Sequence, residues 1–209
     1  LFNSVDGLVQ KEKETAQTIV ARMNVGTEPY SDPKVRRAMQ LAVDNNIVMQ
    51  LGIEGNGLVG EDHHVGPMHP EYADLGPSEH DPEAALALLE EAGQRDAEFE
   101  LISIDGDWQR TTMDAVGAML RQAGLRVKRT VIPGATFWNK WTEYPFSVTD
   151  WGGRPLGVQV LALAYRSGGA WNETGYANPD FDARLDEALG LDDADARREV
   201  MADLERMLR

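Results

Sequence analysis

The sequence predicts an α/β fold, and three neighbouring segments carry that prediction. FELISI (99–104) and LRVKRTVI (125–132) alternate apolar and polar residues as β-strands do. Residues 108–123 between them have the apolar spacing of an amphipathic helix, and Gly124 ends it. A strand, a helix and a strand in this order form a β–α–β unit, whose strands are parallel and whose crossover is right-handed. The core sheet is therefore expected to contain parallel strands.

The chain before this unit is expected to begin its ordered part with a strand and a helix. TIVARMNVG (18–26) predicts a strand that leads into a turn. Asp32 before Pro33 marks a helix start, because aspartate caps a first turn and proline fits the first helical position. Apolar residues then recur at intervals of three and four, which predicts one helix over 33–52 with Gly52 as its C-cap.

Glycines and prolines mark the expected element boundaries and loops in the rest of the chain. Asp81–Pro82 repeats the helix-start signal, and the residues before it are rich in Gly, Pro and His without a clear period. At least four strands and about seven helices are expected in all. The remaining elements, in chain order, are a long ordered loop over 52–80, a helix over 82–92, a short helix over 135–142, a strand over 146–151, a helix from Pro155 to about 166, a Gly-rich loop over 167–178, a helix from Pro179 and a last helix over 193–208.

Composition excludes several classes of function. The formal net charge of −15 disfavours nucleic acid and anionic membranes as partners, because both would repel the chain. The absence of cysteine excludes disulfides, thiolate catalysis and cysteine-based metal sites. No run of eighteen apolar residues and no signal peptide occur in the sequence. Because the first residue is Leu1 and the last helix stops uncapped at Arg209, we expect the coding sequence to continue on both sides.

Motifs for cofactors, metals and catalysis lack their required context. GNGLVG (55–60) satisfies the dinucleotide-binding pattern, but a helix precedes it and a loop follows, so we interpret it as loop. His63, His64 and His69 lie close together, yet no pair has the helical spacing of metal ligands. No nucleophile elbow with a matching base occurs. We therefore expect no catalytic residue, no bound metal and no cofactor.

The stretch FSVTDWGGRP (146–155) is the strongest candidate for a binding site. A buried strand runs directly into Asp150, Trp151, two glycines and Arg154. Open α/β sheets bind ligands beyond the carboxyl ends of their strands. Trp108 follows one predicted strand and Trp151 ends another, so both could border one cleft, or both could belong to the core. The helical spacing of Trp138 and Trp141 predicts that these two are core residues.

The order of motifs over residues 20–209 resembles the extracellular solute-binding proteins of family 5, the peptide, oligopeptide and nickel receptors of ABC importers. Each motif is weak alone, and the combination is specific. The motifs that carry the resemblance are NVGTEPYSDPKVRRA (24–38), AVD (42–44), the glycine loop, DPEAALALLEEAG (81–93), ATFW (135–138), Trp151 and NETGYANPDFD (172–182).

This resemblance implies a lobe of the type II periplasmic binding protein-like fold, with a mixed sheet flanked by helices. Residues 25–209 would form the second, C-terminal ligand-binding lobe, incomplete at its C-terminal end, and residues 1–24 a hinge-proximal segment. The first lobe would be absent from this chain. The implied function is a periplasmic or extracellular, non-catalytic receptor that captures a small peptide or related polar organic solute. It would deliver this ligand to an ABC permease in the inner membrane, and an isolated lobe could dimerise through its exposed cleft face.

The resemblance also implies the site residues. In peptide-binding members an acidic residue three positions after the tryptophan takes the ammonium group of the ligand, whereas Arg154 stands there in this chain. Either the ligand presents an acidic group to Arg154, or Asp150 takes over the cation, or Arg154 points outward or pairs with an acidic neighbour. Alternative functions are a receptor for an acidic non-peptide solute or for nickel, and a small α/β hydrolase domain. The positions that match the family's pocket are Trp108, Asn139, Trp151, Arg154, Trp171 and Asn172.

Overall fold

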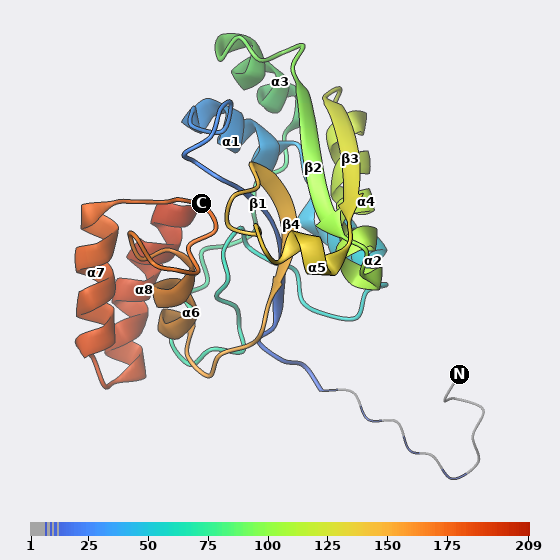
Figure 1. Ribbon diagram of the computed structural model, residues 1–209. Coiled ribbons are helices and arrows are strands. Elements are labelled where there is room, and N and C mark those ends of the chain that lie inside the picture. Colours follow the sequence, from blue (N-terminus) through green and yellow to red (C-terminus); the bar gives the residue numbers. More distant parts are fainter. Residues whose placement is uncertain (1–6, 8, 10, 12) are drawn as a thin grey trace.

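The computed structural model describes residues 7, 9, 11 and 13–209 of the chain (Figure 1). Within them the chain forms four strands and eight helices, so the α/β prediction is confirmed. Of the expected hinge-proximal segment 1–24, residues 1–6, 8, 10 and 12 lie outside the described residues.

The strands form one mixed sheet in the order β1–β4–β2–β3. They span, in that order, Thr18–Met23, Phe146–Trp151, Glu98–Ile104 and Arg126–Ile132. β2 is parallel to β3 and β4, whereas β1 is antiparallel to β4. The strands β2, β3 and β4 therefore end at one edge of the sheet, which we call the carboxyl edge. Thr18, the first residue of β1, lies at this edge too, because it pairs with Trp151.

The helices flank the sheet as predicted, with α4 behind β2 and β3, and with α6, α7 and α8 grouped beside β1 and β4 (Figure 1). No helix in the described part of the chain is long and apolar enough to cross a bilayer. The helices span Pro33–Leu41 (α1), Asn45–Gly52 (α2), Pro82–Glu91 (α3), Asp107–Gln122 (α4), Gly134–Phe137 (α5), Gly157–Ala164 (α6), Pro179–Gly190 (α7) and Ala194–Leu208 (α8).

The prediction of one helix over 33–52 is wrong, because α1 and α2 are separate helices. The Asp44 side chain accepts the backbone N–H of Asn46 at 2.9 Å and so caps a new helix. The carbonyl left free at the end of α1, on Leu41, accepts the backbone N–H of Asp81 at 2.9 Å. The apolar spacing over 33–52 therefore spans two helices, because Asp44 caps a second helix within it.

The described residues contain two hydrophobic cores. The first lies between the sheet and the helices α1, α3 and α4, and it contains Phe99, Leu101 and Phe146. The second lies among α6, α7 and α8 and includes Trp151 from the end of β4. Trp151 therefore stands where the sheet meets the second core, at the carboxyl edge.

The segment 53–81 has no helix or strand, as predicted, yet it is anchored to the second core. The buried carboxylate of Glu71 accepts the backbone N–H of Val158 at 3.1 Å, at the start of α6. Val65 packs against Gly157, where an added Cβ would lie 2.7 Å from the Val65 side chain. Such anchoring makes this long segment an ordered part of the fold.

Candidate functional site

Four tryptophans form a continuous cluster at the carboxyl edge, which we call the aromatic wall. Ring centroids lie 6.0 Å apart for Trp138 and Trp141, and 6.1 Å apart for Trp141 and Trp151. Trp171 lies 6.1 Å from Trp151 and 6.5 Å from Trp141. Trp151 is buried, whereas Trp138 and Trp171 are 42% and 48% exposed. The wall therefore offers exposed indole surface on a buried base, as a ligand-binding surface does.

The prediction that Trp138 is a core residue is wrong, and the expected helix over 135–142 is too long. α5 ends at Phe137, which fills the core position and is fully buried. The chain then continues in turns, so the helical spacing no longer holds. Trp138 faces solvent, and Trp141 is half-buried against the second core.

A buried ion pair underlies the wall. Arg22 Nε of β1 donates to Glu173 Oε2 at 2.9 Å, and both side chains are almost fully buried. Glu173 Oε1 accepts from the Thr149 hydroxyl at 2.8 Å and from Trp151 Nε1 at 2.7 Å. Burial lowers the pKa of the Arg22 guanidinium, and the negative charge of Glu173 opposes that shift. Sequence reasoning missed this pair, although an arginine inside the apolar strand TIVARM was a signal for it.

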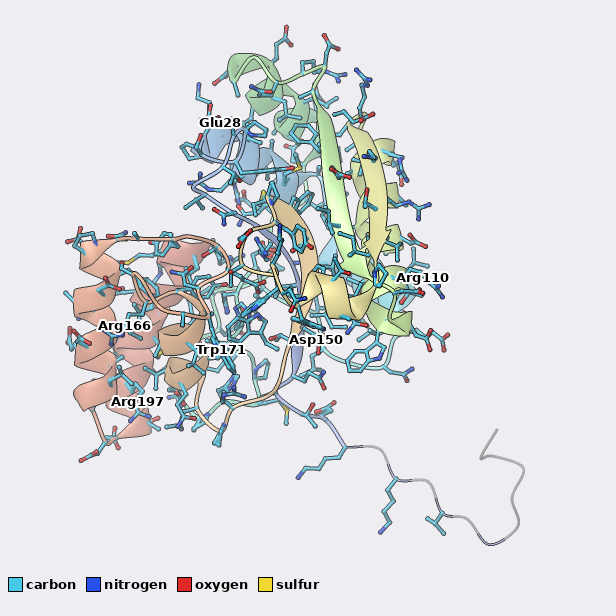
Figure 2. All side chains as sticks on the ribbon, viewed as in Figure 1. Glu28, Arg110, Asp150, Arg166, Trp171 and Arg197 are labelled. Carbon is cyan, nitrogen blue, oxygen red and sulfur yellow. The ribbon has the colours of Figure 1, made fainter. Side chains whose placement is uncertain are left out.

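Asp150 lies at the lower end of β4, and Trp171 lies further towards α6 (Figure 2). Gln109 Nε2, in the first turn of α4, donates to Asp150 Oδ1 at 2.7 Å. Gly106 lies against this contact, because an added Cβ would lie 2.4 Å from Gln109 Oε1 and would displace the amide. Asp150 is half-buried and uses one carboxylate oxygen in this bond, and its other oxygen has no side-chain partner among the described residues.

Arg154 follows the two glycines and is half-buried. Its Nη1 donates to the carbonyl of Gly152 at 2.9 Å and more weakly to that of Gly153 at 3.4 Å. Among the residues that the structure describes, it forms no salt bridge, so the expected pairing with an acidic neighbour is not seen there. Gly153 permits a close approach of the chain, because an added Cβ would lie 2.9 Å from the backbone of Ala16.

The other predicted site residues have different surroundings. Asn172 uses its amide within its own loop, donating to the carbonyls of Arg166 at 3.1 Å and Tyr176 at 2.7 Å. Asn139 is exposed next to Trp138. Trp108 is exposed at the start of α4 and lines a groove of about 1200 Å³ beside β1. Trp108 and Trp151 are linked only through their neighbours, by the bond from Gln109 to Asp150.

The three histidines are packed in the interior rather than gathered around one point. His64 Nδ1 lies 2.9 Å from the Tyr165 hydroxyl, and its ring lies edge-on to Trp151 at 5.1 Å. His69 Nδ1 accepts the backbone N–H of Gly66 at 3.1 Å. Burial lowers the pKa of His63 to about 4 and that of His64 to about 3. In the described residues no three histidine, aspartate or glutamate side chains are arranged to hold a metal ion.

A cluster of Glu205, Glu61 and His63 was also missed by sequence reasoning. Glu205 of α8 is fully buried, and its Oε2 lies 3.8 Å from His63 Nε2. The same histidine nitrogen lies 3.9 Å from Glu61 Oε2. Burial, followed by the charge of Glu61, raises the pKa of Glu205 to about 8. This cluster lies between the segment 53–81 and α8.

Comparison with proteins of known sequence gives consistent matches. The family described as "Bacterial extracellular solute-binding proteins, family 5 Middle" matches residues 2–173. The glutathione-binding protein GsiB of Pectobacterium atrosepticum is 27% identical over 206 residues, which cover 87% of this chain and 38% of that protein. The chain thus spans about two fifths of the length of this relative.

Solved structures give the same fold. The clavulanic acid biosynthesis oligopeptide binding protein 2 is 27% identical with a TM-score of 0.78, covering 93% of this chain and 39% of that one. AppA from Bacillus subtilis, in complex with a nonapeptide, is 18% identical with a TM-score of 0.82, covering 94% and 43%. NikZ from Campylobacter jejuni, in complex with Ni(L-His), is 18% identical with a TM-score of 0.80, covering 92% and 42%. The fold is that of type II periplasmic binding proteins, and the chain belongs to the bacterial extracellular solute-binding proteins of family 5.

Proposed function

We propose that this chain forms the second lobe of a receptor that captures a small peptide or a related polar organic solute for an ABC importer. One observation carries the proposal: the exposed indoles of Trp138 and Trp171 contact Trp141 and Trp151 at the carboxyl edge, and the short segment around Trp151 also holds Asp150 and Arg154. Indole faces supply contact area, and a few charged groups fix the orientation of a ligand.

The charges at this edge suit a ligand that bears both an ammonium and a carboxylate. Asp150 keeps one carboxylate oxygen beyond its bond to Gln109. Nη1 of Arg154 donates to two backbone carbonyls, whereas its Nε and Nη2 have no partner among the described residues. The positively charged guanidinium of an arginine suits a carboxylate of the ligand far better than an ammonium group of the ligand. We therefore propose an acidic peptide-like ligand, and the glutathione-binding relative supports this class, since glutathione is such a compound.

Capture would involve closure of the receptor's first lobe over the carboxyl edge of this one. A ligand that makes contacts only in the closed state shifts the population to that state. In this proposal residues 25–209 form the second lobe, and residues 1–24 lie near the hinge. The receptor would act in the periplasm or outside the cell, deliver its ligand to a permease in the inner membrane, and catalyse no reaction.

A nickel receptor built on the histidines finds less support. His63 and His64 are buried in the second core, and the described residues hold no metal-binding group of three. A dimer of the isolated fragment stays a prediction, which sedimentation velocity can test.

Calorimetric titration of the complete encoded protein tests the proposal. The probes are reduced glutathione, trialanine and the nickel–histidine complex. We expect binding of at least one peptide, and we expect Trp171→Ala to weaken it. Leu163→Ala, at an exposed apolar position of α6, is the matched control. Binding of nickel–histidine alone, or of no probe, would overturn the proposed ligand class.

A further inference from the structure

We propose that Arg22 and Glu173 form the positioning pair of the solute site: they assemble the aromatic wall without touching the solute. This inference rests on the proposed function, because it concerns the same surface. Glu173 is 1% exposed and lies beneath the indoles, so a bound solute could not reach it. Its effect on binding would pass through the tryptophans that it holds.

Three separate segments of the wall converge on this pair. Arg22 donates from Nη1 to the carbonyl of Tyr144 at 2.5 Å and from Nη2 to the carbonyl of Trp141. These bonds fix the turn segment that carries Trp138 and Trp141. Glu173 holds the indole N–H of Trp151 and belongs to the loop that carries Trp171. One guanidinium and one carboxylate therefore set the relative positions of all four indoles.

The carboxylate of Glu173 is matched to its donors. It accepts three hydrogen bonds, from Arg22, Thr149 and Trp151, and all three donor side chains are buried. A glutamine would bring an NH₂ group against at least one of these donors and would leave the Arg22 charge unpaired. Buried donors without acceptors rearrange or admit water. The indole of Trp151 would then lose its fixed orientation.

The loop backbone has other attachments, so loss of the carboxylate need not unfold it. The carbonyl of Thr174 accepts the backbone N–H of Val25 at 2.7 Å. The side chain of Asn172 binds two carbonyls of the same loop. Gly175 packs closely on Asn24, where an added Cβ would lie 2.9 Å from Asn24 Oδ1. A change at Glu173 is therefore predicted to alter the orientation of the indoles more than the backbone conformation of the loop.

Near-ultraviolet circular dichroism of the complete protein without ligand tests the pair directly. Coupled indoles give a signal that depends on their relative orientation. We expect Glu173→Gln to reduce this signal and to increase acrylamide quenching of tryptophan, with the far-ultraviolet spectrum retained. The matched control is Glu71→Gln, which also replaces a fully buried glutamate but one that binds the Val158 N–H and no indole. We expect the control to keep the wild-type near-ultraviolet signal.

Affinity completes the test, with reduced glutathione and trialanine as probes. We expect Glu173→Gln to weaken binding at least tenfold. An unchanged spectrum with unchanged affinity would overturn the inference, and so would an altered spectrum with unchanged affinity. An unchanged spectrum with lost affinity would show direct contact of Glu173 with solute and would also overturn it.

Two further arms keep the result decisive. If Glu173→Gln fails to fold, Arg22→Lys replaces it. Lysine keeps the charge but lacks the fork that reaches two carbonyls and a carboxylate, so we expect the same spectral loss, and a wild-type spectrum would contradict the inference. If the wild-type protein binds neither probe, the proposed ligand class fails, whereas the spectra without ligand still decide whether the pair positions the wall.

Discussion

Gln109 at the start of α4 donates a 2.7 Å hydrogen bond to Asp150 at the end of β4. The bond ties the helix that follows β2 to the neighbouring strand β4 at the carboxyl edge. It also orients the Asp150 carboxylate, because one of its oxygens is held by an amide whose own position depends on Gly106. The other oxygen is then directed by the protein rather than by solvent.

Replacement of Asp150 by asparagine tests whether this carboxylate holds a cationic group of the ligand. A hydrogen bond to a charged group contributes about 1.5–3 kcal/mol, so we expect trialanine to bind at least about tenfold more weakly. N-acetylated trialanine should bind the variant and the wild type equally. Asp114→Asn, on the exposed face of α4, is the control. If Asp150→Asn binds trialanine as tightly as the wild type does, another group of the protein holds the ammonium group of the ligand.

Arg22→Met tests the contribution of the buried ion pair to stability. Removal of one partner leaves the Glu173 charge uncompensated, and such changes cost about 3–5 kcal/mol. We expect urea denaturation to report a loss of this size in the free energy of unfolding. The control is Lys34→Met, which breaks the exposed pair of Lys34 with Glu91 and should change stability little. Equal losses in the two variants would contradict the assignment.

Stability is expected to fall on the alkaline side because of Glu205. Burial raises the pKa of Glu205 from 4.5 to about 8. Its contribution to the free energy of unfolding is therefore fully present below pH 4.5 and is lost as the pH rises to about 8. At about 1.36 kcal/mol per pH unit, the loss between pH 6.5 and pH 8 is about 2 kcal/mol. The groups facing Glu205 are Glu61, Glu71, His63 and Arg206.

Urea denaturation at several pH values between 6.5 and 8 measures how the free energy of unfolding changes with pH. His63 and His64 act in the opposite direction, because their lowered pKa values remove stability only as the pH falls below 6.5. Glu205→Gln should flatten the alkaline slope, whereas Glu199→Gln, exposed on the same helix, should retain it. A slope that survives in Glu205→Gln would place the titrating group elsewhere.

Gly157→Ala tests the docking of the long loop on the second core. The added Cβ would lie 2.7 Å and 3.1 Å from the two methyl groups of Val65, a side chain too stiff to move away freely. Overpacking of this kind costs about 1–3 kcal/mol, which thermal denaturation should detect. Gly134→Ala is the matched control, since nothing lies within 4 Å of its added Cβ. A neutral Gly157→Ala would mean that the loop is loosely docked.

Much of the fold could be predicted because its signals are local. The β–α–β unit follows from periodicity and one C-terminal glycine, and β4 ends at Trp151 as expected. The errors have local causes as well. Asp44 restarts a helix within an apolar period, and α5 stops at Phe137, which exposes Trp138.

The polar interior could not be predicted in the same way. Arg22 and Glu173 are 151 positions apart, and no sequence pattern links them. His63 and Glu205 come from a loop and a distant helix, and only the packing of the second core brings them to 3.8 Å. The sequence located Asp150 and Trp151 at a strand end, but the partners that hold them follow from tertiary structure alone. Their role in ligand binding stays a prediction.

Mass spectrometry of ligand released from the complete protein tests the central claim most directly. The protein would be purified without denaturation, then unfolded, and the released small molecules identified. The account predicts peptides or related polar organic solutes that bear an acidic group, lost from preparations of Trp171→Ala. A preparation that releases no such compound, and whose melting temperature no peptide or acidic solute raises, would contradict it.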